Sequence, residues 1–94
     1  SADCIAIHRN GNYLKIQLKG RFVLNKEYME KDIWIGFPDR DHNIWYLYPH
    51  DTLIEELKQN RESFGFIEWF EKEGVYHTSS LSAALVALLE KHKL

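Results

Sequence analysis

The fold is decided by the stretch Ile5-Ala-Ile-His-Arg-Asn-Gly-Asn-Tyr-Leu-Lys-Ile-Gln-Leu-Lys19, near the start of the 94-residue chain. Asn10 and Gly11 tolerate the positive φ angles of a tight turn, and residues with strand propensity flank them on both sides. The stretch therefore predicts a β-hairpin whose two strands cover residues 3–9 and 13–19.

The second strand of this hairpin has strictly alternating apolar and polar residues. Successive side chains of a strand point to opposite faces. One face therefore carries Leu14, Ile16 and Leu18, and the other carries Lys15, Gln17 and Lys19.

Two aromatic and β-branched runs predict a second hairpin, formed by residues 33–37 and 44–48. The segment between them, Pro38-Asp-Arg-Asp-His-Asn43, is rich in turn residues. Trp45 and Tyr46 must point to opposite faces of their strand, so only one of these faces can be exposed. The large side chains on both faces indicate a sheet that is covered on both sides for much of its area.

Helices are expected after each hairpin. A short helix or turn at 25–31 has Asn25 as its cap. A helix near 52–62 has Asp51 or Thr52 as its cap, and the spacing to a glutamate three residues after Thr52 fits a capping box.

The last third of the chain predicts a C-terminal helix near 80–92 with a leucine stripe. The cap of this helix is expected at one of two serines, Ser79 or Ser80. Before it, the segment 64–78 fits either a small hairpin (66–70 with 75–78) or a short helix at 64–71. The whole pattern predicts a single α/β domain of residues 1–94, with a mixed sheet of about four strands.

The composition is that of one small folded domain. The chain is 45% hydrophobic, and its single cysteine, Cys4, excludes an internal disulfide framework and a Cys-rich zinc site. No apolar run is long enough to cross a bilayer, so we expect no membrane span and a soluble, cytoplasmic protein. The net charge of −2 divides unevenly, with +3 on residues 1–21 and −5 on the remainder.

An acidic residue and the last three residues of the second strand give the clearest functional signal. Asp3 opens the first strand of the first hairpin, and the second strand ends in Gln17-Leu-Lys19. This arrangement resembles the PD-(D/E)xK nuclease superfamily, the restriction-endonuclease-like fold, in a Gln-x-Lys variant similar to small resolvase-like and repair-associated members. The resemblance covers residues 2–19 and extends weakly through 33–37 and 44–48.

The resemblance implies a DNA endonuclease that depends on Mg²⁺, with Mn²⁺ as a substitute ion. Asp3, Gln17 and the Leu18 backbone carbonyl would bind the metal, because Mg²⁺ prefers hard oxygen ligands. Asp3, Gln17 and Lys19 form the expected catalytic set, in which Lys19 orients water and stabilises charge on the phosphate. The expected contacts to nucleic acid are Arg9, Lys15 and Arg21.

Other interpretations stay open. Gln17 is neutral where the family more commonly has glutamate, which favours a catalytically inactive nuclease-like module that binds nucleic acid or protein. The same residues fit the polar face of an ordinary amphipathic strand beside a solvated Asp3. A two-residue turn would pair Asp3 with Leu18 and face Asp3 away from Gln17, unless a bulge or a longer loop intervenes.

The family also implies a helix and a strand ahead of the residue that corresponds to Asp3. We therefore expect a restriction-endonuclease-like core without its N-terminal helix, or a fragment of a larger nuclease-like domain. A homodimer is expected as one way to cover a bare sheet edge. His50 and Asp51 are a candidate supporting pair near the site, although a helix cap also explains Asp51.

Overall fold

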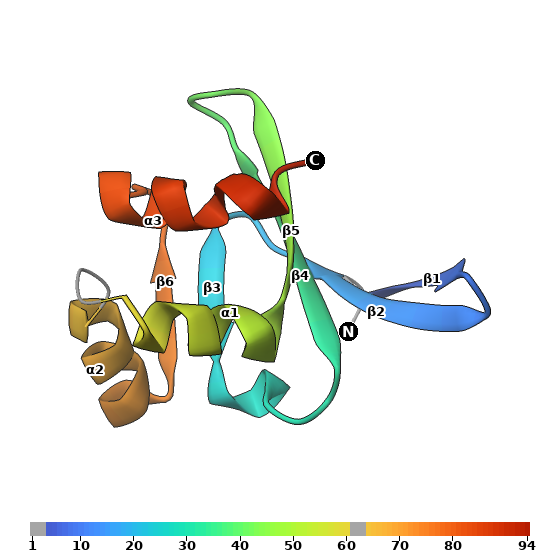
Figure 1. The fold of residues 1–94 in the computed structure, drawn as a ribbon, viewed down its shortest axis with the longest axis horizontal. Coiled ribbons are helices and arrows are strands. Elements are labelled where there is room, and N and C mark those ends of the chain that lie inside the picture. Colours follow the sequence, from blue (N-terminus) through green and yellow to red (C-terminus); the bar gives the residue numbers. More distant parts are fainter. Residues whose placement is uncertain (1–3, 61–63) are drawn as a thin grey trace.

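A four-stranded mixed sheet forms the centre of the structure, a computed structural model that describes residues 4–60 and 64–94 (Figure 1). The strand order is β1-β2-β4-β5. The two hairpins are antiparallel, and β2 runs parallel to β4 between them. The bounds are Cys4–Arg9 for β1, Asn12–Leu18 for β2, Ile33–Asp39 for β4 and Ile44–Pro49 for β5. Both predicted hairpins and the mixed four-stranded sheet are confirmed.

The first hairpin has the plain two-residue turn that its sequence predicts. Asn10 and Gly11 have φ angles of 52° and 82°. The ladder continues from the turn without interruption to Cys4 opposite Gln17. Because β2 pairs with β4 only from Lys15 onward, the turn end of the hairpin extends beyond β4 and away from the helices (Figure 1).

A second, two-stranded sheet was not predicted. It pairs β3 (Phe22–Asn25) with β6 (Val75–Thr78) in antiparallel fashion. The first three residues of β3 are all buried, so this strand lacks the alternation that identifies a half-exposed strand. A strand this short, without a periodic pattern, could not be told apart from a loop that follows the first hairpin.

The helical segments follow the predicted order. They are η1 (Lys26–Tyr28), α1 (His50–Lys58), α2 (Phe64–Glu73), α3 (Ala83–Leu89) and η3 (Glu90–His92). Asn25 caps η1 as expected, since its side chain accepts a hydrogen bond from the Glu27 N–H at 2.9 Å. In the segment 64–78, the helical alternative is the correct one, and the chain then continues into β6. No helix in the described ranges is long and apolar enough to cross a bilayer.

The predicted caps of α1 and α3 are wrong. Helix α1 begins at His50, after Pro49, and no side chain caps it. Asp51 and Thr52 therefore lie inside the first turn, and both carboxylate oxygens of Asp51 bind other partners, the His50 ring and the Glu30 N–H. Helix α3 is capped by Ser82, whose Oγ accepts a hydrogen bond from the Leu85 N–H at 3.2 Å.

The serines expected to cap α3 lie instead in the turn that precedes it. The Thr78 hydroxyl donates to the Ser80 carbonyl and accepts from the Ser80 N–H, at 3.0 and 3.1 Å. This local bonding satisfies the backbone of Ser80 before the helix begins. Ser79 and Ser80 therefore belong to the connection between β6 and α3.

The hydrophobic core lies on one side of the four-stranded sheet. Alternate residues of β4 and β5 enter it and pack with α1, α3 and the small sheet; they are Ile35, Phe37, Tyr46 and Tyr48. On the opposite face, Trp45 is 48% exposed and Leu18 is 38% exposed. Ile16, on the same outer face as Leu18, is only 5% exposed, so the predicted cover of both faces holds for part of the outer face and not at Trp45 and Leu18.

Tyr48 connects the two sheets inside this core. Its hydroxyl donates to the Val23 carbonyl at 2.7 Å and accepts from the Val23 N–H at 3.3 Å, in a fully buried position. Burial raises the pKa of Tyr48 far above its ordinary value, so the hydroxyl keeps its proton and its role as donor.

The variant Tyr48→Phe should lower the free energy of unfolding by about 1–3 kcal/mol, because it leaves buried polar groups of Val23 without this partner. Urea unfolding followed by circular dichroism measures the change. Tyr13→Phe removes the same hydroxyl from a side chain that is 70% exposed and should change stability by less than about 0.5 kcal/mol. Equal effects of the two variants would contradict this role of Tyr48.

Candidate functional site

Gln17 and Lys19 lie on the side of β2 that faces the helices. A Cβ built on Gly36 of β4 would lie 3.2 Å from Leu18 Cδ2, so Leu18 belongs to the outer face of the sheet. Because side chains alternate along a strand, its neighbours Gln17 and Lys19 belong to the inner face, at the edge of the core. Gln17 and Lys19 thus share a face that Leu18 does not, as the alternation predicts. The face of Gln17 and Lys19 is the one that borders the core.

The expected metal ligands are only partly described. Gln17 and Leu18 end β2, whereas Asp3 lies outside the described residues. Among the residues that the structure does describe, no group of three or more His, Cys, Asp or Glu side chains could hold a metal ion. The amide oxygen of Gln17 and the main-chain oxygen of Leu18 fit Mg²⁺ in donor type, and the carboxylate of the expected set would have to come from Asp3.

The register of the hairpin bears on the position of this set. Cys4 pairs with Gln17, and the ladder from there to the turn contains no bulge. This is the register that a plain two-residue turn predicts. A bulge or bend that would turn Asp3 toward Gln17 is therefore absent between Cys4 and Arg9.

Lys19 is held at both its main chain and its side chain. Its N–H donates to the Gly36 carbonyl at 2.8 Å, which continues the pairing of β2 with β4. Its Nζ lies 5.5 Å from the centre of the Tyr28 ring, within the range of a cation–π interaction. The ammonium group is therefore directed to the inner side of the sheet.

His50 packs against the ring of Tyr28 and is fully buried. The two rings meet edge to face with their centres 5.4 Å apart. His50 Nε2 accepts a hydrogen bond from the Asn25 N–H at 3.0 Å, so the ring proton is on Nδ1, which donates to Asp51 Oδ1 at 2.9 Å. This network assigns the neutral tautomer, in which one ring nitrogen accepts and the other donates.

Burial and hydrogen bonding set the charges of this pair. Burial lowers the pKa of His50 below its ordinary value and outweighs the opposing effect of Asp51. Burial alone would raise the pKa of Asp51, but the hydrogen bonds from His50 and from the Glu30 N–H hold it below its ordinary value. The Glu30 N–H donates to Asp51 Oδ2 at 2.8 Å. The expected pairing of His50 with Asp51 is confirmed, and the carboxylate does not cap α1.

Lys19, Tyr28, His50 and Asp51 thus form a continuous series from the end of β2 to the start of α1. The position of Tyr28 was not predictable from the sequence. Tyr28 ends a single 3₁₀ turn and belongs to no periodic pattern. Only the tertiary fold brings its ring between a lysine and a histidine that are both distant from it along the chain.

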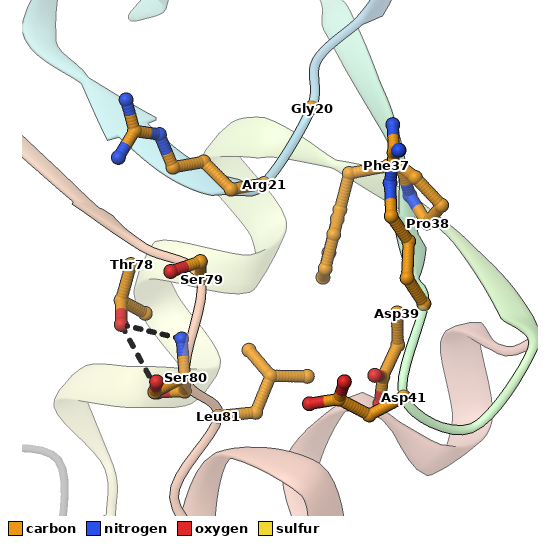
Figure 2. Close-up of a pocket in the computed structure, with 11 residues that line it drawn as sticks. Gly20, Arg21, Phe37, Pro38, Asp39, Asp41, Thr78, Ser79, Ser80 and Leu81 are labelled. Carbon is orange, nitrogen blue, oxygen red and sulfur yellow. Dashed lines mark hydrogen bonds between the residues drawn. The ribbon is translucent and has the colours of Figure 1, made fainter.

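A pocket of about 310 Å³ opens beyond the carboxyl ends of β2 and β4, close in sequence to Lys19. In Figure 2, the carboxylates of Asp39 and Asp41 point into this pocket, and the guanidinium of Arg21 points away from it. His42 Nδ1 lies 2.8 Å from Asp39 Oδ2. The sequence identified these aspartates only as turn residues, and their convergence on the pocket arises from the fold.

Two of the three side chains expected to contact nucleic acid lie within the described part of the structure. Lys15 is exposed on the inner face of β2, in line with Lys19. Arg21 is exposed beyond the end of that strand. The side chain of Arg9 lies outside the described part of the structure.

Stability should decrease as the pH falls from about 8 to about 5. The unfolded chain protonates His50 near its ordinary pKa of 6.5, whereas the folded chain resists protonation because the pKa is lowered. The contribution of neutral His50 is therefore complete above pH 6.5 and is lost as the pH drops. The contribution of Asp51, whose pKa is also lowered, is lost only under more acidic conditions.

The variant His50→Leu should flatten part of this pH dependence and lower the free energy of unfolding at pH 8 by about 1–3 kcal/mol, because the Asn25 N–H loses its acceptor. Urea unfolding at several pH values measures both effects. The exposed His77 provides the control His77→Leu, which should keep the wild-type pH profile. An unchanged profile in His50→Leu would show that other groups cause the pH dependence.

Comparisons of this chain with protein-family models, curated proteins and solved structures found no match. A functional assignment therefore depends on the residues and contacts described above.

Proposed function

We propose that this chain is a Mg²⁺-dependent DNA-cleaving module of the PD-(D/E)xK type, built on a restriction-endonuclease-like core. The observation that supports the proposal is the common inner face of Gln17 and Lys19 at the carboxyl end of β2. The strand belongs to a hairpin that joins a mixed sheet with helices on its inner side. A metal ligand and a charge-stabilising lysine must lie on the same face of the strand if both are to reach one phosphodiester.

The chemistry of the donor set fits hydrolysis of a phosphodiester. Asp3, Gln17 and the Leu18 carbonyl would hold Mg²⁺, or Mn²⁺ in its place, through oxygen atoms. A bound divalent ion stabilises charge on the phosphate and lowers the pKa of a water molecule. The ammonium of Lys19 would bind a phosphate oxygen or orient the attacking water from the same face.

The surroundings of Lys19 support this role. The Tyr28 ring lies under its ammonium, and its main chain is bonded to Gly36 of the neighbouring strand. A long flexible side chain loses conformational entropy when it must adopt one position for catalysis. Contacts that direct it beforehand reduce that loss during the reaction.

A second candidate function is a catalytically inactive module of the same fold that binds nucleic acid or protein. The neutral Gln17 favours it, because an amide carries no charge and binds a divalent cation less tightly than a carboxylate. Titration with Mg²⁺ or Mn²⁺, followed by the amide chemical shifts of Asp3 and Gln17, distinguishes the two candidates. The absence of both chemical-shift changes and cleavage of supercoiled DNA would favour the inactive module.

The variant Lys19→Ala should reduce Mg²⁺-dependent nicking of supercoiled DNA by at least about 100-fold, because the charge on the phosphate loses its cationic partner. The fold should persist, since Lys19 does not enter the buried cluster. Lys72→Ala removes the same charge from an exposed position on α2 and should nick DNA at the wild-type rate. Wild-type nicking by Lys19→Ala would remove Lys19 from the mechanism.

The variant Gln17→Glu should lower the Mg²⁺ concentration needed for half-maximal nicking, because it adds a carboxylate to the proposed metal ligands. The exposed Gln59 at the end of α1 offers the matched control Gln59→Glu. This control makes the same change of net charge and should leave the Mg²⁺ dependence as it is. Identical Mg²⁺ titrations for the wild type and both variants would exclude Gln17 as a ligand.

A further inference from the structure

The turn end of the β1–β2 hairpin stands out from the rest of the molecule as a two-stranded ribbon (Figure 1). β2 pairs with β4 only over Lys15–Leu18, so residues 12–14 have β1 as their sole partner strand in the described sheet. An isolated two-stranded ribbon is marginally stable in water. Asn10, Gly11 and Tyr13 are exposed at this end of the ribbon.

The inner face of this ribbon carries a row of side chains that leads to the proposed site. Tyr13 is 70% exposed and Lys15 is exposed, and both share a face with Gln17 and Lys19. Alternate residues of a strand lie about 6.5 Å apart, so Lys15 and Lys19 are separated by about 13 Å along β2. A polyanion that contacts both lysines would also cross Gln17.

The distribution of charge identifies the chemical class of the partner. No aspartate or glutamate occurs from Cys4 to Arg21, and this segment contains four lysines and arginines. The chain beyond Arg21 carries a charge of −5. A polyanion is therefore attracted to the hairpin and repelled by the rest of the domain, which would orient it along the ribbon.

We propose that the turn end of the β1–β2 hairpin enters a groove of duplex DNA. Lys15 then contacts a backbone phosphate, and Tyr13 packs against the wall of the groove. This inference rests on the proposed function and specifies the form of its substrate. The major groove is about 12 Å wide and admits a two-stranded β-ribbon. Binding of a single strand relies on successive aromatic platforms, and among the described side chains of the ribbon only Tyr13 is aromatic.

Fluorescence anisotropy of the full chain with a labelled 20-base-pair duplex tests the proposal. Measurement in EDTA and at low salt separates binding from cleavage. Lys15→Ala should weaken binding about fivefold and reduce the slope of log affinity against log salt by about 0.9, the value for one phosphate contact. Lys15→Glu should weaken it further. Lys72→Ala, which removes an equal charge from α2, should bind as the wild type does.

Tyr13→Ala should weaken duplex binding about fivefold or more without changing the salt slope, because it removes a contact that carries no charge. The matched control is Trp69→Ala, which removes a 56% exposed aromatic side chain from α2 and should have no effect. A single-stranded oligonucleotide of the same length should bind more weakly than the duplex. Circular dichroism of each variant verifies that the fold is kept.

Three results would overturn the inference: no duplex binding by the wild type, equal binding by the hairpin variants and their controls, or tighter binding of the single strand. Duplex binding that depends on Lys15 and Tyr13, in a protein that never nicks DNA with Mg²⁺, would support the inference and contradict the nuclease proposal. If the hairpin variants bind the duplex as their controls do, nicking by the wild type would still support the nuclease proposal.

Discussion

A neutral imidazole inside the core joins segments that are far apart in the sequence. His50 accepts from the main chain at the end of β3 and donates to Asp51, which in turn binds the main chain after η1. The connection between β3 and β4 is thereby held against the start of α1. The same ring supports Tyr28, and Tyr28 contacts the ammonium of Lys19. The geometry around the proposed site therefore depends on a histidine that remains uncharged.

The two faces of the central sheet differ in a way that local sequence does not reveal. The alternation in β2 correctly separates Gln17 and Lys19 from Leu18. The alternation does not say whether the polar or the apolar side chains of β2 face the helices, because that depends on β4 and on the elements that pack over it. Phe37 and the two buried tyrosines of β5 take the core side, and Gly36 lets Leu18 approach closely on the other. The polar side of β2 therefore borders the core, where a site can form.

The sequence predicts those parts of the fold that depend on interactions between residues close together in the chain. The turn at Asn10 and Gly11 and the alternation beyond it depend on neighbours in the chain, and both hairpins were predicted for that reason. The strand β3 depends on a partner near the other end of the domain, so its residues gave no local signal. For the same reason the role of Tyr28 could not be predicted.

Helix boundaries illustrate competition between local and tertiary preferences. Thr52 and Glu55 have the spacing of a capping box, yet α1 begins at His50, whose buried ring bonds to the Asn25 N–H, and both residues lie inside the helix. Within the candidate site, the shared face of Gln17 and Lys19 could be predicted from strand periodicity alone. The convergence of Asp39 and Asp41 on a pocket could not, because it requires the end of β6 and the connection from β6 to α3 on the opposite wall.

The pairing of β3 with β6 has a consequence for how the protein folds. Phe22 lies opposite Thr78, so this pairing closes a loop that contains the second hairpin, α1 and α2. Closing so long a segment costs conformational entropy before its contacts give any return, and nonlocal pairing slows folding. We expect the two hairpins to form early, the small sheet to form after them, and α3 to dock once β6 is in place. Until then Phe22 and its neighbours in β3 are exposed to water, and a partly folded chain would be most prone to self-association at this point.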